Sequence, residues 1–341
     1  MKRLGMAALA AAAGVSVATV DRVLNGREAV REETRLQIAE AARRINHPAA
    51  RRLLKMGDDL PVLRIGMLLH KQGQDFYKAF AEAITLAVAQ AQGVRGQLVL
   101  EFSPSQAPSE MASHLRAMAG RCDVLAATAV NHPEVTAAVE SLRGLGLPVF
   151  SLLSDFAQGA RAGYIGLNNL KVGRTAGWLM ATLSRNPGVM AIFVGGHRWH
   201  GHDLRETGFR GYLRECAPHL TVLDPLVNLE TRQLTYDATL GLLARQPDLR
   251  GIYVSGGGME GAIAALRESP PSRRVPMVVS ALTPDSRAGL AEGIVSMVID
   301  TPLEKLCRDL VALMVAASTD GAPQGTAQYF LPPDLHVPES L

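Results

Sequence analysis

The chain has 341 residues, which is room for two or three domains with hydrophobic cores of their own. Hydrophobic residues make up 48% and charged residues 20%; this ordinary globular usage argues against a disordered chain and against a membrane protein. The net charge is only +3, and three widely separated cysteines predict neither a disulfide framework nor a CxxC metal site. This cysteine usage fits a reducing, cytoplasmic location, and we expect no membrane partner.

The positive charge is concentrated at the start of the chain. Residues 1–57 hold eleven Lys and Arg against five Asp and Glu, an excess of six positive charges. Because the whole chain carries +3, the remaining residues carry an excess of three negative charges. A basic segment binds a polyanion by neutralising phosphates and releasing counterions. The first segment is therefore predicted to contact nucleic acid, and the rest of the chain is not.

Three short helices are predicted in this basic segment. The first covers Leu4 to Ala13, and Gly14 ends it with a tight turn. Ser16 caps a second helix over Val17 to Leu24, and a third covers Glu32 to Arg44. The apolar start is short and no cleavage site follows it, so we expect it in the mature protein. This layout is that of a helix-turn-helix, in which the second helix enters the major groove.

The turn and the second helix carry a specific resemblance. The string is Gly14-Val15-Ser16-Val17-Ala18-Thr19-Val20-Asp21-Arg22-Val23-Leu24-Asn25-Gly26. It closely resembles the headpiece of the lactose/galactose repressor (LacI/GalR) family, which implies a DNA-binding headpiece over residues 1–46. The resemblance implies base-edge contacts from Val17, Ala18 and Arg22, and phosphate contacts from Ser16, Thr19, Asn25 and Thr34. Physical chemistry supports these roles separately, because Arg can bridge guanine O6 and N7 while hydroxyls and amides suit phosphate oxygens.

Residues 47–61 are predicted to form a hinge helix and a linker. The stretch is too short to be stable as an isolated helix in water. Ala50-Arg51-Arg52-Leu53 matches the family's Ala-Arg-x-Leu pattern, which implies that Arg51 contacts DNA and that Leu53 wedges between base pairs. His47 stands where the family has Tyr, and the segment is one residue short. Leu54 as the wedge and a plain basic linker therefore stay open as alternatives.

The rest of the chain alternates short apolar runs with helical stretches. The predicted strands are Leu63 to Leu69, Gln97 to Phe102, Val124 to Ala127, Pro148 to Leu152, Val189 to Val194, Leu249 to Val254, Val275 to Val279 and Ile294 to Ile299. Helices such as Phe76 to Ala91 and Gln106 to Ala119 lie between them. The pattern is typical of an α/β protein with repeated βαβ units and buried parallel strands.

This body resembles the effector domain of the same family. The implied fold class is α/β: a small all-α helix-turn-helix headpiece, then a two-lobed type I periplasmic-binding-protein-like body of parallel sheets flanked by helices. We expect residues 62–164 and 302–322 to form the N-lobe. Residues 165–301 and 323–341 are expected to form the C-lobe.

Polar and aromatic residues follow several predicted strands, where ligands of α/β proteins bind. The resemblance implies an effector site at such loops, between the lobes. The candidate residues are Gln74, Phe76, Tyr77, Asp155, Asn169, Arg205, Ser255 and Asp300. Aromatic rings stack on the C–H face of a sugar while polar groups satisfy its hydroxyls. The glycines 256–258 either bring backbone N–H groups to the ligand or form a plain turn, so a sugar, a polyol and a sugar phosphate all stay open.

Three histidines, His197, His200 and His202, crowd one loop. Their spacing is not set by a predicted helix, so a zinc site is disfavoured against a position at the cleft rim or simple exposure to solvent. No GxSxG, HExxH or Walker pattern occurs in the sequence. We therefore predict no catalytic residues, no metal and no cofactor.

The sequence as a whole predicts a DNA-binding transcriptional regulator, specifically a repressor of carbohydrate or polyol metabolism genes. It would bind a pseudopalindromic operator as a homodimer and respond to a small effector. The sign of that response is left open. The alternative is a carbohydrate-binding receptor, or a carbohydrate-processing enzyme, with a vestigial headpiece.

Overall fold

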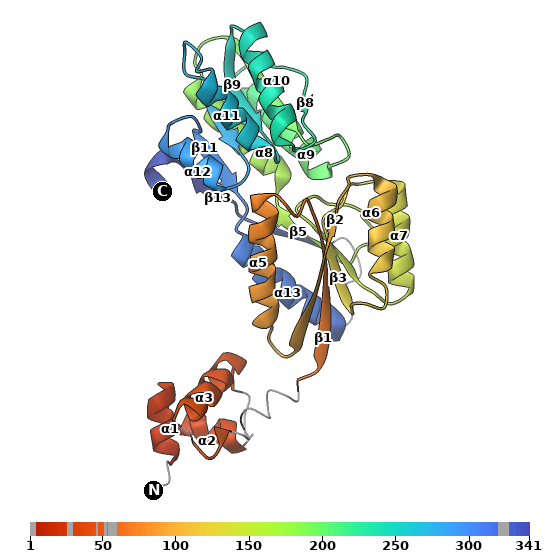
Figure 1. Cartoon of the computed structure of the whole chain (residues 1–341), viewed down its shortest axis with the longest axis vertical. Helices are drawn as coiled ribbons and strands as arrows, with labels where there is room; N and C mark the ends of the chain where they lie inside the picture. Colours follow the sequence, from red (N-terminus) through yellow and green to blue (C-terminus); the bar gives the residue numbers. More distant parts are fainter. Residues whose placement is uncertain (1–4, 26–29, 46, 51–52, 54–59, 320–326) are drawn as a thin grey trace. The chain divides into compact units, whose positions relative to one another are not determined.

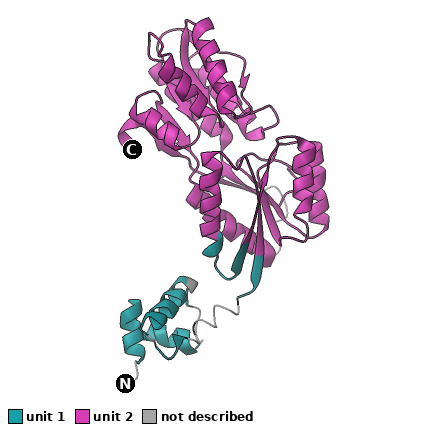
Figure 2. Ribbon diagram, viewed as in Figure 1, with its two compact units in different colours: residues 1–63, 88–97 teal, residues 64–87, 98–341 magenta. Residues whose placement is uncertain are grey.

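The computed structural model describes residues 5–25, 30–45, 47–50, 53, 60–319 and 327–341. It divides into two compact units (Figure 2). The first comprises residues 1–63 and 88–97, and the second residues 64–87 and 98–341. Within the described residues no single helix is both long enough and apolar enough to span a membrane. The helices Met6–Ala13 and Val17–Asn25 meet that criterion only together, as a pair bent by 110°.

The first unit begins with three helices, α1 (Met6–Ala13), α2 (Val17–Asn25) and α3 (Glu32–Arg44), close to the predicted ranges (Figure 1). Gly14 has φ of 67° and ends α1, because only a residue without a Cβ adopts this left-handed conformation at no steric cost. Ser16 Oγ accepts a 3.1 Å hydrogen bond from the Thr19 N–H and so caps α2. The predicted turn chemistry therefore produces the tight connection between α1 and α2.

A small hydrophobic cluster holds these helices together. Its buried members are Leu9, Ala10, Ala13, Val20, Val23, Ile38, Ala39, Ala41, Ala42 and Leu53. Leu53, which is expected to wedge between base pairs on DNA, belongs to this cluster in the chain without DNA, and its role as a wedge stays a prediction. Leu53 is only 6% exposed and its N–H donates to the Ala49 carbonyl, and Ala49 and Ala50 also pack against the cluster.

The first sheet of the body has six described strands in the order β12-β5-β4-β3-β1-β2. The bounds are β1 Val62–His70, β2 Arg95–Ser103, β3 Val124–Ala127, β4 Val149–Leu152, β5 Gly163–Leu167 and β12 Gln328–Leu331. Strands β3, β4 and β5 are buried along their whole length, as expected of parallel strands covered on both faces. Helices α5 (Asp75–Ala89), α6 (Pro108–Ala117), α7 (Pro133–Gly144) and α13 (Leu303–Thr319) flank this sheet (Figure 1).

The second sheet has seven described strands, with β13-β11-β10-β9-β6-β7 in line and β8 paired to β6. The bounds are β6 Gly188–Val194, β7 Leu220–Val222, β8 Leu226–Val227, β9 Leu249–Val254, β10 Met277–Val279, β11 Met297–Asp300 and β13 Asp334–His336. Its helices are α8 (Asn169–Leu183), α9 (His200–Cys216), α10 (Arg232–Arg245), α11 (Met259–Glu268) and α12 (Pro284–Ala291), and a 3-10 turn (Pro338–Ser340) ends the chain. The predicted fold class is confirmed.

The strand pairing differs from the expected lobe boundaries. Residues 165–301 and 323–341 were expected in the C-lobe, but β5 and β12 both belong to the first sheet. Gln328 pairs with Tyr164 and Leu331 with Leu167, in parallel. The chain therefore leaves the first sheet after Leu167 and again after Leu331. A strand of five residues has no sequence periodicity that assigns it to one sheet; only its hydrogen-bonding partner does so.

Candidate DNA-contacting surface and ligand cleft

Helix α2 separates a buried face from an exposed one. Val20 and Val23 are at most 4% exposed, whereas Val17 is 46% exposed and Ala18 and Arg22 are exposed. Ala18 and Arg22 are four residues apart and so lie on one face, away from the buried Val20 and Val23, while Val17 is exposed in the first turn of the helix. The three side chains predicted to reach base edges are therefore all accessible.

The predicted phosphate-contacting residues lie around this helix. Ser16 Oγ and Thr19 Oγ1 are 2.8 Å apart at its N-terminus, where exposed N–H groups favour an anion. Asn25 Nδ2 donates to Asp21 Oδ1 at 2.7 Å, so both side chains are engaged with each other in the chain without DNA. Thr34 is partly exposed in the first turn of α3. Arg51 lies outside the described residues.

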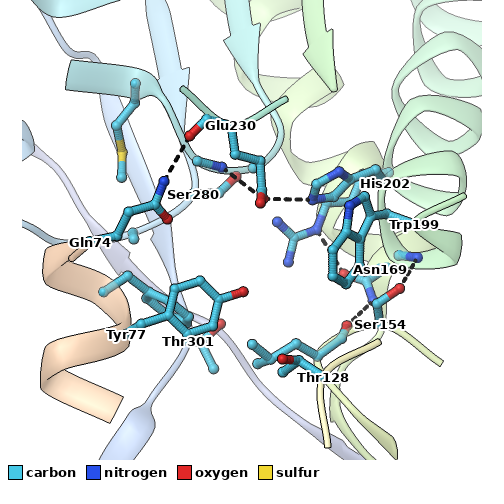
Figure 3. Close-up of a pocket in the computed structure, with 18 of the residues that line it drawn as sticks. Gln74, Tyr77, Thr128, Ser154, Asn169, Trp199, His202, Glu230, Ser280 and Thr301 are labelled. Carbon is cyan, nitrogen blue, oxygen red and sulfur yellow. Dashed lines mark hydrogen bonds and ion pairs between the residues drawn. The ribbon is translucent and has the colours of Figure 1, made fainter. Parts of the chain in front are cut away.

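A cavity of about 80 Å³ lies within the body, between loops that follow strands of both sheets (Figure 3). A buried water needs roughly 10–15 Å³ by this measure, so the cavity has room for a small molecule. Its lining residues are Gln74, Phe76, Tyr77, Thr128, Leu152, Leu153, Ser154, Asn169, Trp199, Gly201, His202, Arg205, Glu230, Gly256, Gly257, Met259, Glu260, Ser280, Ala281 and Thr301. Five of the eight predicted effector residues are among them: Gln74, Phe76, Tyr77, Asn169 and Arg205.

Asp155 does not line the cavity, contrary to the sequence prediction. Arg161 donates to its carboxylate at 2.5 and 2.8 Å, and Ser151 Oγ donates at 2.7 Å. Burial by itself raises the pKa of Asp155, but the hydrogen bonds from Arg161 and Ser151 outweigh it and hold the pKa below its ordinary value. The carboxylate therefore organises the turn after β4 instead of meeting a ligand.

Ser255 and Asp300 also differ from their predicted role. Ser255 Oγ donates to the Phe193 carbonyl at 2.7 Å and does not line the cavity, although the next two glycines do. Asp300 lies in a separate open groove, where its Oδ1 accepts from the Leu282 N–H at 3.1 Å. Both side chains bond to backbone groups that are distant in sequence, Ser255 to β6 and Asp300 to the residue Leu282 after β10.

Arg205 is held in place by groups from three segments. Its Nε donates to Asn169 Oδ1 at 2.7 Å, and its Nη1 donates to the Ser255 carbonyl at 2.6 Å. Asn169 Nδ2 in turn donates to the Leu153 carbonyl at 2.9 Å. A guanidinium locked in this way presents its remaining N–H groups in a fixed direction, which suits recognition of ligand oxygens.

Trp199 is a cavity residue that sequence reasoning missed. It lies on the loop between β6 and α9 and is 4% exposed, and it packs with the hydrophobic cluster of the first sheet. Its indole Nε1 donates to Gln106 Oε1 at 3.0 Å, and next to it the Asn131 N–H donates to the Arg198 carbonyl at 2.8 Å. The loop from the second sheet is therefore anchored in the first.

His202 separates from the other two histidines of the crowded loop. It is buried and lines the cavity, whereas His197 and His200 do not line it. Across the described ranges, no three or more His, Cys, Asp or Glu side chains are grouped so as to hold a metal ion. His202 lies in the first turn of α9, the helix that follows β6, and this place in the chain could have singled it out, because ligands of α/β folds bind beyond the carboxyl ends of the strands.

Glu230 is the second missed residue, and its turn is unusual. Leu229 and Glu230 have φ of 48° and 54°, a left-handed conformation that costs non-glycine residues energy. Asn228 holds the turn by accepting from the Glu230 N–H at 2.8 Å and by donating to the Gly257 carbonyl at 2.9 Å. No sequence motif marks this turn, so only the structure places a carboxylate in the cavity.

Two sequence families match this chain. The family described as "Periplasmic binding protein domain" matches residues 65–322. The family described as "Bacterial regulatory proteins, lacI family" matches residues 6–48. No curated protein sequence matches the chain.

Several solved structures share the fold of the body. GanP, a glucose-galactose binding protein from Geobacillus stearothermophilus, has 17% identity and a TM-score of 0.73, covering 82% of this chain and 99% of that one. A solute binding protein from Burkholderia graminis in complex with D-arabinose has 18% identity and a TM-score of 0.73, covering 82% and 96%. One from Bacillus halodurans with bound myo-inositol has 16% identity and a TM-score of 0.72, covering 82% and 96%.

Proposed function

Because this chain belongs to the LacI/GalR family of regulators, with a LacI-family segment at residues 6–48 and a periplasmic-binding-protein domain at 65–322, we propose that it is a repressor controlled by a sugar-like effector. It acts in the cytoplasm on genes of carbohydrate or polyol metabolism. It binds a pseudopalindromic operator as a homodimer, since two half-sites related by two-fold symmetry need two headpieces.

The exposed face of α2 is the observation that carries the DNA-binding part of the proposal. Val17, Ala18 and Arg22 are exposed while Val20 and Val23 close the headpiece core. Arg22 reads a guanine, and Val17 and Ala18 contact thymine methyl groups. Ser16 and Thr19 supply the phosphate contacts that fix the register of the helix.

The chemistry of the cavity supports the effector part. Phe76, Tyr77 and Trp199 supply rings for the C–H faces of a sugar or polyol. Asn169, Arg205 and other polar side chains supply partners for its hydroxyl groups. The neighbours solved with D-arabinose and myo-inositol have the same fold at low identity, which agrees with an effector of this class.

An effector regulates by linkage between its cleft and the operator. A ligand that binds one arrangement of the lobes better than another must change operator affinity by the same coupling free energy. Such couplings are typically about 1–3 kcal/mol, equal to a change of about 5- to 150-fold in affinity.

A gel-shift titration of the full chain with a library of palindromic half-sites tests this function. We expect salt-sensitive binding with a clear sequence preference, and a shift in operator affinity when a panel of sugars and polyols is added. The absence of sequence preference at every salt concentration would contradict a regulator and favour a receptor or an enzyme. A dimer on DNA is checked by the mass of the complex.

A further inference from the structure

His202 has one ring nitrogen turned to the protein and the other to Glu230. Its Nδ1 accepts a 3.0 Å hydrogen bond from the Gly195 N–H. Burial lowers the pKa of His202 to about 4, so the ring is neutral at pH 7. A neutral imidazole whose Nδ1 accepts must carry its proton on Nε2. His202 is therefore a hydrogen-bond donor on the side that faces Glu230.

Glu230 supplies a carboxylate opposite this donor. His202 Nε2 and Glu230 Oε1 are 3.6 Å apart, which is beyond a hydrogen bond (Figure 3). Oε1 accepts from the Gly257 N–H at 3.2 Å, while Oε2 is buried without a hydrogen bond from any described residue. Burial by itself raises the pKa of Glu230, but His202, Lys71 and the Gly257 N–H together hold it below its ordinary value. The carboxylate is ionised and has acceptor capacity left.

The surroundings of the pair are shaped to hold it. A Cβ at residue 256 would lie 2.6 Å from His202 Nε2, and a Cβ at residue 195 would lie 2.6 Å from Glu230 Cγ. Glycine at these two positions makes the space that both side chains occupy. The left-handed turn at Leu229 and Glu230 adds backbone strain, which persists only where the surrounding contacts impose it.

We propose that His202 and Glu230 form a hydroxyl-recognition pair that selects an uncharged polyhydroxy effector and rejects phosphorylated or carboxylated ones. One hydroxyl group accepts from His202 Nε2–H through its oxygen and donates its own proton to the Glu230 carboxylate. A phosphate or carboxylate group placed between the two side chains is mostly deprotonated at neutral pH, so it has no proton to donate to Glu230 and meets a like charge. This inference rests on the proposed sugar-like effector and narrows its chemical class.

The other charges of the cavity agree with this class. Glu260 is a second carboxyl in the lining. Lys71 Nζ lies 3.6 Å from Glu230 Oε2 and also donates to the Leu229 carbonyl, so its charge is directed to this turn. Two donors of Arg205 are bound to Asn169 and Ser255. The cavity thus has no cluster of uncommitted cations among its lining residues of the kind that phosphate groups require.

Calorimetry on the full chain tests the pair with neutral probes and their charged counterparts. The probes are D-arabinose, D-galactose and myo-inositol, each against its monophosphate, and D-galactose against D-galacturonate. We expect at least one neutral probe to bind about 100-fold or more tightly than its charged counterpart, because a site built for a hydroxyl leaves buried polar groups unpaired with the wrong ligand.

Substitutions then locate the discrimination. Glu230→Gln removes the charge but keeps the size, and we expect about 10-fold weaker binding of the neutral probe, as for the loss of one charge-assisted hydrogen bond, and a smaller difference in affinity from its phosphate. His202→Leu removes the donor, whereas His202→Gln keeps an N–H and restores part of the affinity. Glu140→Gln, an exposed acid on α7, is the matched control and leaves both affinities unchanged. Thermal unfolding confirms that each variant is folded; if Glu230→Gln is not, the His202 series decides.

The outcomes separate this inference from the proposed function. If phosphates bind as tightly as the neutral probes and shift operator affinity, the proposal of a hydroxyl-recognition pair is wrong, and the proposed regulatory function is supported. If neutral probes bind equally well in all His202 and Glu230 variants, the pair is likewise wrong. If neither class of probe binds and none changes operator affinity, both the proposal of a sugar-like effector and the proposal of the hydroxyl-recognition pair are wrong.

Discussion

Gln74 Nε2 donates a 2.7 Å hydrogen bond to the backbone carbonyl of Glu230. Gln74 lies before α5, against the first sheet, whereas Glu230 lies in a turn of the second sheet. Lys71 donates to the neighbouring Leu229 carbonyl, and Trp199 donates to Gln106 in the opposite direction. Gln74, Trp199 and Glu230 also line the cavity, so the turn that would hold the effector also joins the two lobes.

Removing the Gln74 bond should favour an open cleft. We expect Gln74→Ala to shift the equilibrium between closed and open forms by about 1 kcal/mol, the usual net contribution of one hydrogen bond. The emission of Trp199 reports the change in a Trp178→Phe background, because Trp199 is 4% exposed when the cleft is closed. A red-shifted emission and a larger radius of gyration by X-ray scattering are expected. Gln90→Ala, at an exposed residue, is the control; equal spectra for both variants would contradict the prediction.

Arg22 should determine the sequence preference at one base pair of the operator. We expect Arg22→Ala to weaken operator binding by about 1–3 kcal/mol and to relax the preference at a single position. Binding to a library with one randomised base pair measures this. Arg43→Ala, on the exposed side of α3, serves as the control, and any loss there should be uniform across sequences. A uniform loss for Arg22→Ala would assign this residue to a phosphate.

Leu53 should stabilise the headpiece in the absence of DNA. Truncating a buried leucine costs about 2–5 kcal/mol, so we expect Leu53→Ala to reduce the hydrogen-exchange protection of α3 in the full chain without DNA. Leu36→Ala, at a position 50% exposed on α3, should leave that protection nearly unchanged. Full protection in Leu53→Ala combined with loss of DNA bending would instead support the wedge.

The body should lose stability as the pH falls from about 6.5. Burial lowers the pKa of His202 to about 4 from an ordinary 6.5. Between these values the unfolded chain binds a proton that the folded chain does not, so the free energy of unfolding decreases with falling pH, by about 3 kcal/mol at most. Above pH 6.5 neither state binds this proton, and the contribution is constant.

Two neighbouring groups should also lower the free energy of unfolding as the pH falls. Burial also lowers the pKa of His70, and the pKa of Glu230 is held low, so both add to the acid loss. Urea unfolding at several pH values measures the slope, and His202→Gln should flatten it between pH 6.5 and 4. An unchanged slope in that variant would show that His202 is not buried as a neutral ring.

Local patterns in the sequence were sufficient for the headpiece and most of the sheets. A glycine, a capping serine and two valines three residues apart determine α1, the turn and the exposed face of α2. Apolar runs marked strands such as β3 and β9 at their observed bounds. Each of these features depends on neighbours in the chain, which is why residue type and spacing predict it.

Asp155 and Glu230 show what residue type and spacing do not predict. Both are acids near strand ends. Arg161 and Ser151 bind the carboxylate of Asp155, whereas a left-handed turn directs the carboxylate of Glu230 toward His202. Which polar side chain meets a ligand and which completes the protein's own hydrogen bonds depends on contacts between residues far apart in sequence. The amino-acid sequence determined the headpiece helices, the exposed residues of α2 and eight of the thirteen described strands; the tertiary structure alone placed Glu230 in the cavity and decided which strand belongs to which sheet.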